Sequence, residues 1–361
     1  MTNQSGLLQD DFESRNTSRN LFRGFVIAAG VFLLVAVITA IAFVFLYQPI
    51  VPATQLVYAI QRLDSQSEIV TSSEMVEPLT RRLRHFFGPG MQVNALDEAH
   101  VEVILPTQDP MDLAVAKDLL VSTGVLRFLP IADRDQNISL SKRVEQAGDP
   151  PSLSRDVLNT DGTIVGRWVT VGFDDTAMLN DQITSLNVDL KSPIVRDSET
   201  GEVLSLPNQV LGNDNKIKIA QWMQEHAIRS IDVLTLVEET QAVNGEDLAF
   251  AAVTFDERGD PAVAFTFNDA GSKKMEALTI THSPKGNSLT QLGVVLDDQL
   301  ITAPNVHGVI RGEGRITGNF TQSEVDFYVQ IMQAGQLPAK LDPQPISETK
   351  TTASYNFLDS L

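Results

Sequence analysis

Residues that commonly carry out catalysis occur in this sequence, but none of them has the spacing of a known site. The histidines, which could act as bases or metal ligands, are far apart, at His85, His100, His226, His282 and His307. They form no HExxH motif, and the chain has no cysteine that could bind zinc or act as a nucleophile. No G-x-S-x-G elbow occurs, although a Ser-His-Asp triad assembled from distant residues stays open. We therefore expect a protein that is not an enzyme and that binds no metal or cofactor.

Paired carboxylates are another arrangement that could perform acid–base chemistry, and Asp297 and Asp298 form such a pair. Adjacent residues of a strand point to opposite faces, so the two carboxylates would not meet on one face. Aspartate is also common in tight turns. The pair is therefore predicted to be a hairpin turn between strands near Leu292–Leu296 and Leu300–Ala303.

A glycine-rich stretch at Gly312, Gly314 and Gly318 could in principle cradle a phosphate group. Glu313 lies inside it and would repel a phosphate, and no P-loop Lys-Ser/Thr pair follows. These glycines are better interpreted as the flexible backbone of a tight turn that enters a short strand. The role predicted for them is structural.

The helix that follows has a clear start signal. Thr321 and Glu324 form an S/T-x-x-E capping box, and Asn319 is a second candidate for the capping residue. Phe320 precedes Thr321 and is expected to pack against Val325 as a hydrophobic staple.

Composition limits the class of protein and its partners. At 361 residues with 43% hydrophobic residues, the chain can bury a large core, and two packed units are expected. Asp and Glu total 46 against 27 Lys and Arg, which gives a formal net charge of -19. Nucleic acid is therefore not an expected partner, because its phosphates would be repelled.

The run from Phe25 to Leu46 contains no charged residue and is long enough to cross a lipid bilayer. It is apolar on all sides, unlike most buried core helices, and too long for the core of a cleavable signal peptide. Three arginines precede it, and no Lys or Arg occurs between residues 48 and 61. The positive-inside rule then predicts a cytoplasmic tail at 1–24, a single anchor at 25–47 and a body outside the cytoplasm.

Residues 55–131 are predicted to form a ferredoxin-like base module, with helices on one face of an antiparallel sheet. The helix starting at Thr71 has a capping box with Glu74 and ends at Gly88–Gly90. The predicted βαββαβ order is a strand at 56–60, the helix from 71, strands at 91–94 and 101–105, a helix from 109 to 124, and a strand at 125–130.

The rest of the body divides into three predicted parts. Residues 132–215 are expected to be a β-rich insertion with strands at 167–173 and 186–195 and a hairpin turn at 197–201. Residues 216–337 are expected to be a second α+β module, the head, and residues 338–361 a polar C-terminal tail. The head elements are helices at 216–225, 270–278 and from 321 to Gly335, and strands at 231–237, on both sides of 257–260, at 292–296 and at 300–303.

Five stretches of this sequence resemble the first extracytoplasmic domain of the SecD family or the segment that follows it. GEDLAFAAVTFDERGDPAVAFTFNDAGSKKMEALT (245–279), LGVVLDDQLITAPNV (292–306) and GEGRITGNFTQSEV (312–325) are similar to its head, and VEVILPTQDPMDLAVAKDLLVSTGVLRFLPI (101–131) to its base. AGQLPAKL (334–341) is similar to the stretch that leads back towards the membrane. The family-motif positions are expected to be structural: Gly245, Asp247, Gly293, Asp297, Pro304, Gly312, Gly314, Gly318, Asn319 and Phe320.

The resemblance implies an accessory of Sec-dependent protein export at the cytoplasmic, or inner, membrane, with its body in the periplasm. It implies as partners the lipid bilayer, the Sec translocon or SecD and SecF subunits, and an unfolded exported polypeptide held by apolar surface between head and base. The resemblance also implies that a complete SecD protein crosses the membrane several times and is driven by proton flow. This sequence shows no later apolar run, and its predicted span has no titratable residue. We therefore expect no proton-driven activity. The alternative is an anchored envelope scaffold that keeps the fold without an export role.

Overall fold

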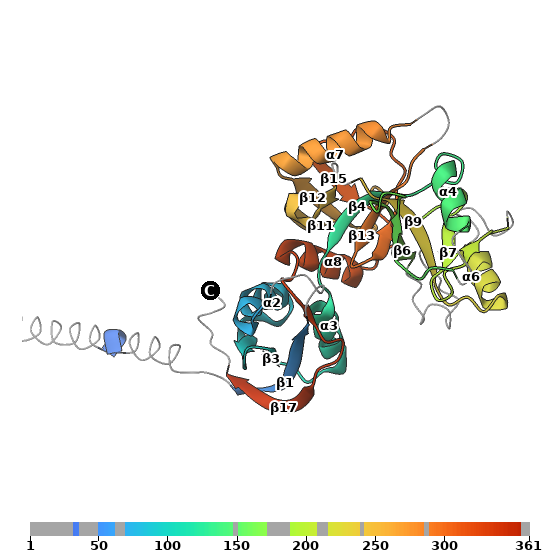
Figure 1. Cartoon of the computed structure of the whole chain (residues 1–361). Coiled ribbons are helices and arrows are strands. Elements are labelled where there is room, and N and C mark those ends of the chain that lie inside the picture. The colour runs from blue at the N-terminus through green and yellow to red at the C-terminus, as the bar shows by residue number, and fades with distance from the viewer. Residues whose placement is uncertain are drawn as a thin grey trace, which may run out of the picture.

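The computed structural model describes residues 32–35, 50–61, 69–146, 151–171, 188–207, 216–238, 242–284 and 289–354. Apart from the short helical segment at 32–35, these residues form two lobes of mixed α and β structure (Figure 1). We call the lobe that contains β1, β3, β17, α2 and α3 the base lobe. We call the lobe that contains β4, β6, β9, β11 to β15 and α6 to α8 the head lobe.

The base lobe is an antiparallel sheet with two helices packed on one face (Figure 1). Its apolar side chains alternate along β3, where Val101, Val103 and Leu105 are buried. The capping box predicted at Thr71 and Glu74 is confirmed, and Gly88 ends the same helix. The elements are β1 (Ile50–Gln61), α2 (Ser72–Phe87), the 3₁₀ turn η1 (Gly88–Gly90), β2 (Gln92–Ala95), β3 (His100–Leu105), α3 (Pro110–Val121), β16 (Lys340–Leu341) and β17 (Ser347–Ser354).

The fourth strand of this sheet differs from the prediction. The sequence placed 125–130 in the base sheet, but β4 (Leu126–Pro130) pairs with β13 (Leu292–Leu296) in the head lobe. The position beside β1 is taken by β17, whose register runs from Ile50 opposite Ser354 to Val57 opposite Ser347. Residues 340–341 and 347–354 are therefore strands of the base sheet, and the prediction of a polar tail is wrong for them.

The head lobe contains a nine-stranded sheet and a three-stranded sheet among the described residues. The first has the order β10-β4-β13-β14-β6-β9-β7-β8, with β5 on β6, and the second has the order β11-β12-β15. The remaining elements are α4 (Ile138–Glu145), β5 (Asp156–Leu158), β6 (Ile164–Val171), β7 (Val195–Asp197), β8 (Val203–Leu204), α6 (Lys216–Glu225), β9 (Ile231–Leu236), β10 (Val243–Asn244), η4 (Gly245–Asp247), β11 (Leu248–Phe255), β12 (Pro261–Phe267), α7 (Asp269–Thr281), β14 (Gln299–Thr302), β15 (Glu313–Ile316) and α8 (Gln322–Ala334).

Most head elements lie where their sequence patterns predicted them. Helices α6, α7 and α8, strand β9, the hairpin of β11 and β12, and the pair β13 and β14 are all confirmed. The described part of 132–215 does not form a separate insertion, because β6 and β7 both pair with β9 in the sheet that holds β13 and β14. The turn predicted at 197–201 is confirmed between β7 and β8, whereas α4 was not expected.

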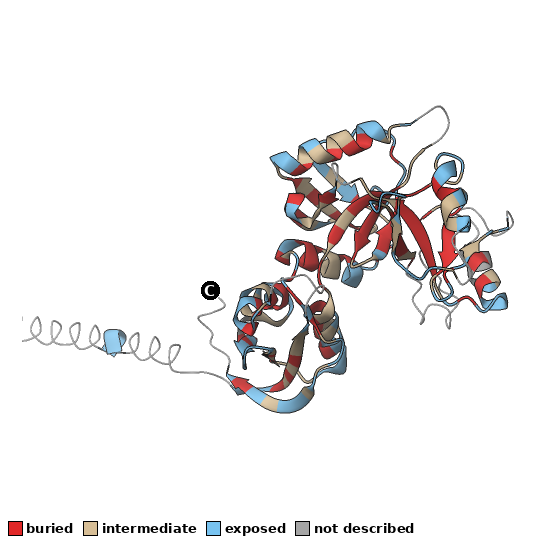
Figure 2. Ribbon diagram, in the orientation of Figure 1, coloured by how far each residue is buried: buried red, intermediate tan, exposed pale blue. Residues whose placement is uncertain are grey.

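One hydrophobic core continues from the base lobe into the head lobe (Figure 2). It includes Leu79 and Leu83 of α2, Phe128 of β4, and Val325 and Met332 of α8. Helix α8 lies between the lobes and is tied to α2 by a hydrogen bond from the Gln330 side chain to the carbonyl oxygen of Arg81. The lobes are thus packed together rather than linked only by the chain.

Within the described ranges, no helix is both long and apolar enough to cross a membrane. The predicted anchor, with Phe25 and Leu46 at its ends, lies outside the described residues except for 32–35.

Candidate functional site at the junction of the two lobes

The chain passes between the lobes after α3, where residues 122–125 lead into β4, and after α8, where residues 335–339 lead into β16 (Figure 1). Residue Thr123 accepts a hydrogen bond from the amide of Leu337 at 2.8 Å, so the two connections lie side by side. If the lobes move relative to each other, the backbone of these two segments must change its conformation.

Arg82 of α2 holds both connections. Its side chain is fully buried, and its guanidinium donates to backbone carbonyl oxygens: Leu119 at 3.2 Å, Ser122, Thr123 at 3.5 Å and Gly335 at 2.7 Å. Burial lowers the pKa of Arg82 to about 10, and the negative charge of Asp297 acts in the opposite direction. These acceptors are uncharged carbonyl groups. The planar guanidinium of Arg82 has several N–H donors, so one side chain fixes the backbone of both connections.

The predicted turn at Asp297 and Asp298 is confirmed between β13 and β14. Both residues have positive φ, at 50° and 63°, as a two-residue type I′ hairpin turn requires. The sequence did not show that Asp297 reaches across to the base connection. Its carboxylate accepts hydrogen bonds from the hydroxyl of Ser122 at 2.6 Å, the hydroxyl of Thr123, the amide of Gly124 at 3.1 Å and the amide of Val125 at 2.9 Å.

Asp298 binds two arginines that come from two strands of the head sheet. Arg167 of β6 donates to it through Nε at 2.9 Å and Nη2 at 3.0 Å, and Arg127 of β4 donates at 3.2 Å. Burial by itself raises the pKa of Asp298, but the hydrogen bonds and charge of Arg167, with the charge of Arg127, lower it overall. The turn thus joins β4, β6, β13 and β14 by charge as well as by strand pairing.

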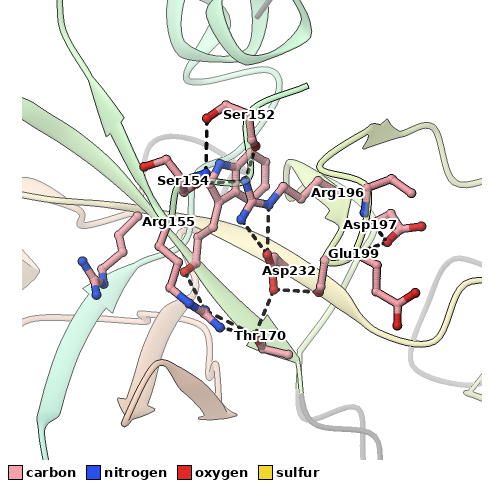
Figure 3. Close-up of polar contacts among 12 residues, drawn as sticks. Ser152, Ser154, Arg155, Thr170, Arg196, Asp197, Glu199 and Asp232 are labelled. Atoms are coloured by element: carbon pink, nitrogen blue, oxygen red, sulfur yellow. Dashed lines mark hydrogen bonds and ion pairs between the residues drawn. The ribbon is translucent and has the colours of Figure 1, made fainter. Parts of the chain in front are cut away.

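Asp232 is the centre of a polar network within the sheet (Figure 3), and Thr170 joins this network to the turn. The amide of Thr170 donates to the carbonyl oxygen of Asp298 at 2.9 Å, and its hydroxyl donates to Asp232 at 2.9 Å. Asp232 also forms an ion pair with Arg196, whose guanidinium lies 4.5 Å from the centre of the Trp168 ring. Both members of this ion pair are 3% exposed, so breaking one partner would leave a buried charge unpaired.

A cavity of about 860 Å³ opens at the junction. Its lining is mixed, and the charged members are Arg127, Asp156, Arg167, Asp297, Asp298 and Lys340. The sequence predicted an apolar surface between head and base, but the lining of this cavity is mixed and partly charged. A second cavity of about 210 Å³ shares Arg127, Asp156 and Arg167 but is otherwise mainly apolar, with Phe128, Ile164 and Leu278 in its wall.

The glycines of the family motifs have packing roles where the structure gives a reason for them. A Cβ atom on Gly314 of β15 would clash with the Phe265 ring, which faces Gly314 across the β12–β15 pair. Gly312 has φ +75°, a conformation that side chains rarely adopt. A Cβ on Gly293 would crowd Leu300 and Ile131, and one on Gly245 would make an ordinary contact with Leu126.

The other predicted motif positions lie in separate parts of the head lobe. Asp247 is buried and paired with Lys274 at 2.9 Å, which ties η4 to α7. Pro304 is exposed, and its carbonyl accepts from the amide of Leu292 at 2.9 Å. Thr321, rather than Asn319, caps α8, since its hydroxyl accepts from the amide of Glu324. Phe320 is buried in the same core cluster as Val325, and Gly318 lies half-buried between β15 and α8.

The described residues hold no cluster of three or more His, Asp or Glu side chains that could bind a metal ion. Two histidines face single carboxylates, His100 towards Asp97 and His282 towards Glu238. The junction carboxylates, in turn, are occupied by amide, hydroxyl and guanidinium donors. This arrangement suits fixed acceptors that hold elements together.

Sequence reasoning missed Arg82, Arg127 and Arg167. Arg82 did leave a signal, because it lies within the apolar face of α2, one residue before Leu83 and three after Leu79. Arginine is rarely fully buried unless it has partners, so its presence on that face indicates a built site. Arg127 and Arg167 alternate with apolar residues in their strands and look like ordinary exposed positions.

Residues 221–339 match a family model described as "SecDF, P1 head subdomain". This part of the chain is a SecD-family head region. It agrees with the SecD subunit of the protein translocase of Rickettsia felis at 36% identity over 107 residues, and with that of Aquifex aeolicus at 35% over 106 residues. The SecD protein of Elusimicrobium minutum is 36% identical over 128 residues.

The SecD matches cover only part of each protein. The first two cover 29% of this chain and 20% of the relative, and the third covers 35% and 25%. A solved structure described as "Structure and function of a membrane component SecDF that enhances protein export" aligns over 81% of this chain and 98% of its own, with 18% identity and a TM-score of 0.46. The SecD-family head region contains the turn at Asp297, which contacts the base lobe.

Proposed function

We propose that this protein is a membrane-anchored, SecD-like accessory of Sec-dependent protein export. In this proposal its lobes lie on the outer side of the inner membrane and contact a polypeptide during translocation. A single span at Phe25–Leu46 anchors it with the amino terminus in the cytoplasm. It works beside the Sec translocon or SecD and SecF subunits and does not itself use a proton gradient.

The observation that carries this proposal is the SecD-family match over residues 221–339, together with the base lobe to which the head is joined. The match includes Asp297, whose carboxylate accepts from residues 122–125, and Gly335, whose carbonyl accepts from Arg82 of α2. The fixed junction and its cavity of about 860 Å³ suit a body that receives a chain between two lobes. The mixed lining suits an extended polypeptide, which presents polar backbone groups as well as side chains.

The proposed absence of proton-driven activity has a separate basis. The predicted span contains no Asp, Glu, His, Lys or Arg and so has no group that could accept and pass on a proton. Proteoliposomes that contain the purified chain should therefore show no proton flux above that of empty vesicles. Proton movement would overturn this part of the proposal and leave the polypeptide contact untouched.

The second candidate function is that of an anchored scaffold of the cell envelope. It is favoured by the density of fixed partners at the junction, where Asp297, Asp298 and Arg82 all serve structural bonds. In that case the fold is kept, but no exported chain is contacted.

Photo-crosslinking in living cells separates the two functions. A photoreactive amino acid is placed at Gln336 or Lys340, both exposed at the rim of the junction cavity, and at Asp161 as an exposed control on a turn outside its lining. The cells carry a secretory protein arrested during translocation. The export proposal expects crosslinks from 336 and 340, but not from 161, to the arrested chain or to Sec subunits. Crosslinks to one abundant envelope protein, with none to the arrested chain, would support the scaffold instead.

A further inference from the structure

Strand β11 is an edge strand that has no charged residue and no proline from Leu248 to Phe255. Three of its large apolar side chains are exposed: Phe250 at 58%, Val253 at 39% and Phe255 at 57%. Natural edge strands are usually protected by charges, prolines or covering elements, because a bare edge pairs with other chains. An apolar edge of this length without charge or proline therefore indicates a surface that pairs with another strand.

The strand register gives the direction of the backbone groups on this edge. The amide of Asp256 donates to the carbonyl of Asp260 at 2.8 Å, so this pair next to the hairpin turn is hydrogen-bonded. Bonded and non-bonded pairs alternate along an antiparallel ladder, so from 251 to 255, beyond the register shift at Leu248 and Phe250, the odd-numbered residues of β11 make no backbone hydrogen bonds to β12. The bond from Gln333 to the carbonyl of Ala251 agrees with this assignment. The backbone N–H and C=O groups that point away from β12 are those of Ala251, Val253 and Phe255.

Apolar side chains border this edge on both faces of the sheet. Val253 and Phe255 lie on the face that carries the buried Val263, because opposite residues of a strand pair share a face. Phe250 lies on the other face, opposite Thr266. A strand added beside β11 would therefore meet apolar neighbours on each of its faces.

The charges at the ends of β11 indicate which partner fits. Glu246 is exposed before the strand, and Asp256, Glu257 and Asp260 follow it. Arg258 is the only basic residue between 245 and 260; it pairs with both Asp256 and Asp260 and offsets one of these three negative charges. A second copy paired antiparallel would bring these acidic ends together, and the whole chain carries a charge of -19. A segment with Lys or Arg at its ends is attracted instead.

We propose that β11 takes up an extended, apolar segment of another polypeptide as an added strand, and that it prefers segments flanked by Lys or Arg. The identity of that polypeptide as an exported chain rests on the function proposed above. Strand addition relies on backbone hydrogen bonds and so accepts many sequences, as a general export accessory requires. Gln333 and Arg315 bond to the carbonyls of Ala251 and Phe255, and the amides of the added strand replace them.

Hydrogen exchange on the full chain in detergent micelles tests this proposal. The probe is a peptide of about ten residues with alternating valine and threonine and a lysine at each end, and the control peptide has aspartate at each end. The lysine peptide should slow exchange at the amide of Val253 roughly tenfold or more, since that amide gains a bond. The amide of Thr254, which already bonds to β12, should not change, and the aspartate peptide should bind more weakly.

Two variants at one position separate backbone from side-chain effects. Val253→Pro removes an N–H that β12 does not use, so the existing hairpin is kept while the added strand loses a donor. Its affinity for the lysine peptide should fall about tenfold, the effect of one backbone hydrogen bond. Val253→Ala keeps the N–H and should weaken binding less. Equal urea midpoints for both variants would show that each is folded.

Each other outcome has a defined meaning. Unchanged exchange at Val253, or equal binding by Val253→Pro and the wild type, would overturn the proposal. Slowed exchange that depends on protein concentration without peptide would also overturn it in favour of a second copy. If exported chains crosslink at 336 and 340 while β11 gains no protection, the strand proposal fails and the export function stands. If β11 binds the peptide and no exported chain crosslinks, the export function fails.

Discussion

The carboxylate of Asp297 makes the clearest quantitative prediction. Asp297→Asn keeps a residue that tolerates the φ of +50° at this turn, so the hairpin between β13 and β14 should be preserved. What changes is the acceptor capacity, because one carboxylate oxygen becomes an amide that cannot accept hydrogen bonds. The charge that strengthened all four bonds to residues 122–125 is also lost.

The size of the effect follows from the contacts. Of the four donors, the two that met the replaced oxygen lose their acceptor, and a hydrogen bond to a charged group contributes about 1.5–3 kcal/mol. Asp297 is half-buried, and water reaches part of the site, so about 1 kcal/mol for each lost bond is a reasonable value. The expected loss at the junction is about 2 kcal/mol, which corresponds to a roughly 30-fold change in a local opening equilibrium.

Amide hydrogen exchange measures this loss where it occurs. The amides of Gly124 and Val125 donate directly to Asp297, so their exchange should accelerate roughly 30-fold in Asp297→Asn. Asp161→Asn is a matched control, since Asp161 also lies in a turn but accepts from Thr163, which is not part of the junction. Its effect should stay local and leave the two junction amides unchanged.

The reasoning about the junction would be refuted by either of two results. Exchange at Gly124 and Val125 within about threefold of the wild type would mean that Asp297 does not hold the connection. Equal acceleration in Asp297→Asn and Asp161→Asn would mean that the effect is global. An independent urea titration should show a lower midpoint for Asp297→Asn alone.

Three further predictions concern other parts of the two lobes. The lowered pKa of Asp298 contributes stability that is present above the ordinary pKa of 3.8 and is lost as the pH falls below it. The urea midpoint should therefore fall less between pH 5 and pH 3 in Asp298→Asn than in the wild type. An equal fall of the midpoint in both proteins would contradict this. Gly314→Ala should cost about 2 kcal/mol in chemical unfolding through its clash with Phe265, whereas Gly308→Ala, where a Cβ meets open space, should cost much less. Ending the chain at residue 346 removes β17 and should accelerate exchange along the freed edge of β1 and promote self-association in light scattering; a monomer with unchanged β1 protection would exclude this role of β17.

Much of the local structure was determined by the sequence alone. The capping boxes at Thr71 and Thr321, the positive-φ turns, and the apolar alternation of β3 and β12 depend on residues close together in the chain. Their energies are set by nearby backbone groups, so their patterns are visible without knowledge of the fold. The anchor at Phe25–Leu46 stays a prediction from such a pattern.

Only the tertiary structure decided which strands pair and which polar groups meet. The alternation in a strand indicates that one face is buried but not against which partner, so β4 was assigned to the base sheet although it pairs with β13. Strand β17 is polar and mostly exposed, and it therefore lacks the apolar signal that would have indicated its place beside β1. The bonds of Asp297 to residues 122–125 and of Arg82 to Gly335 join positions far apart in the chain. Such bonds form only after the folded backbone has brought their donors and acceptors together.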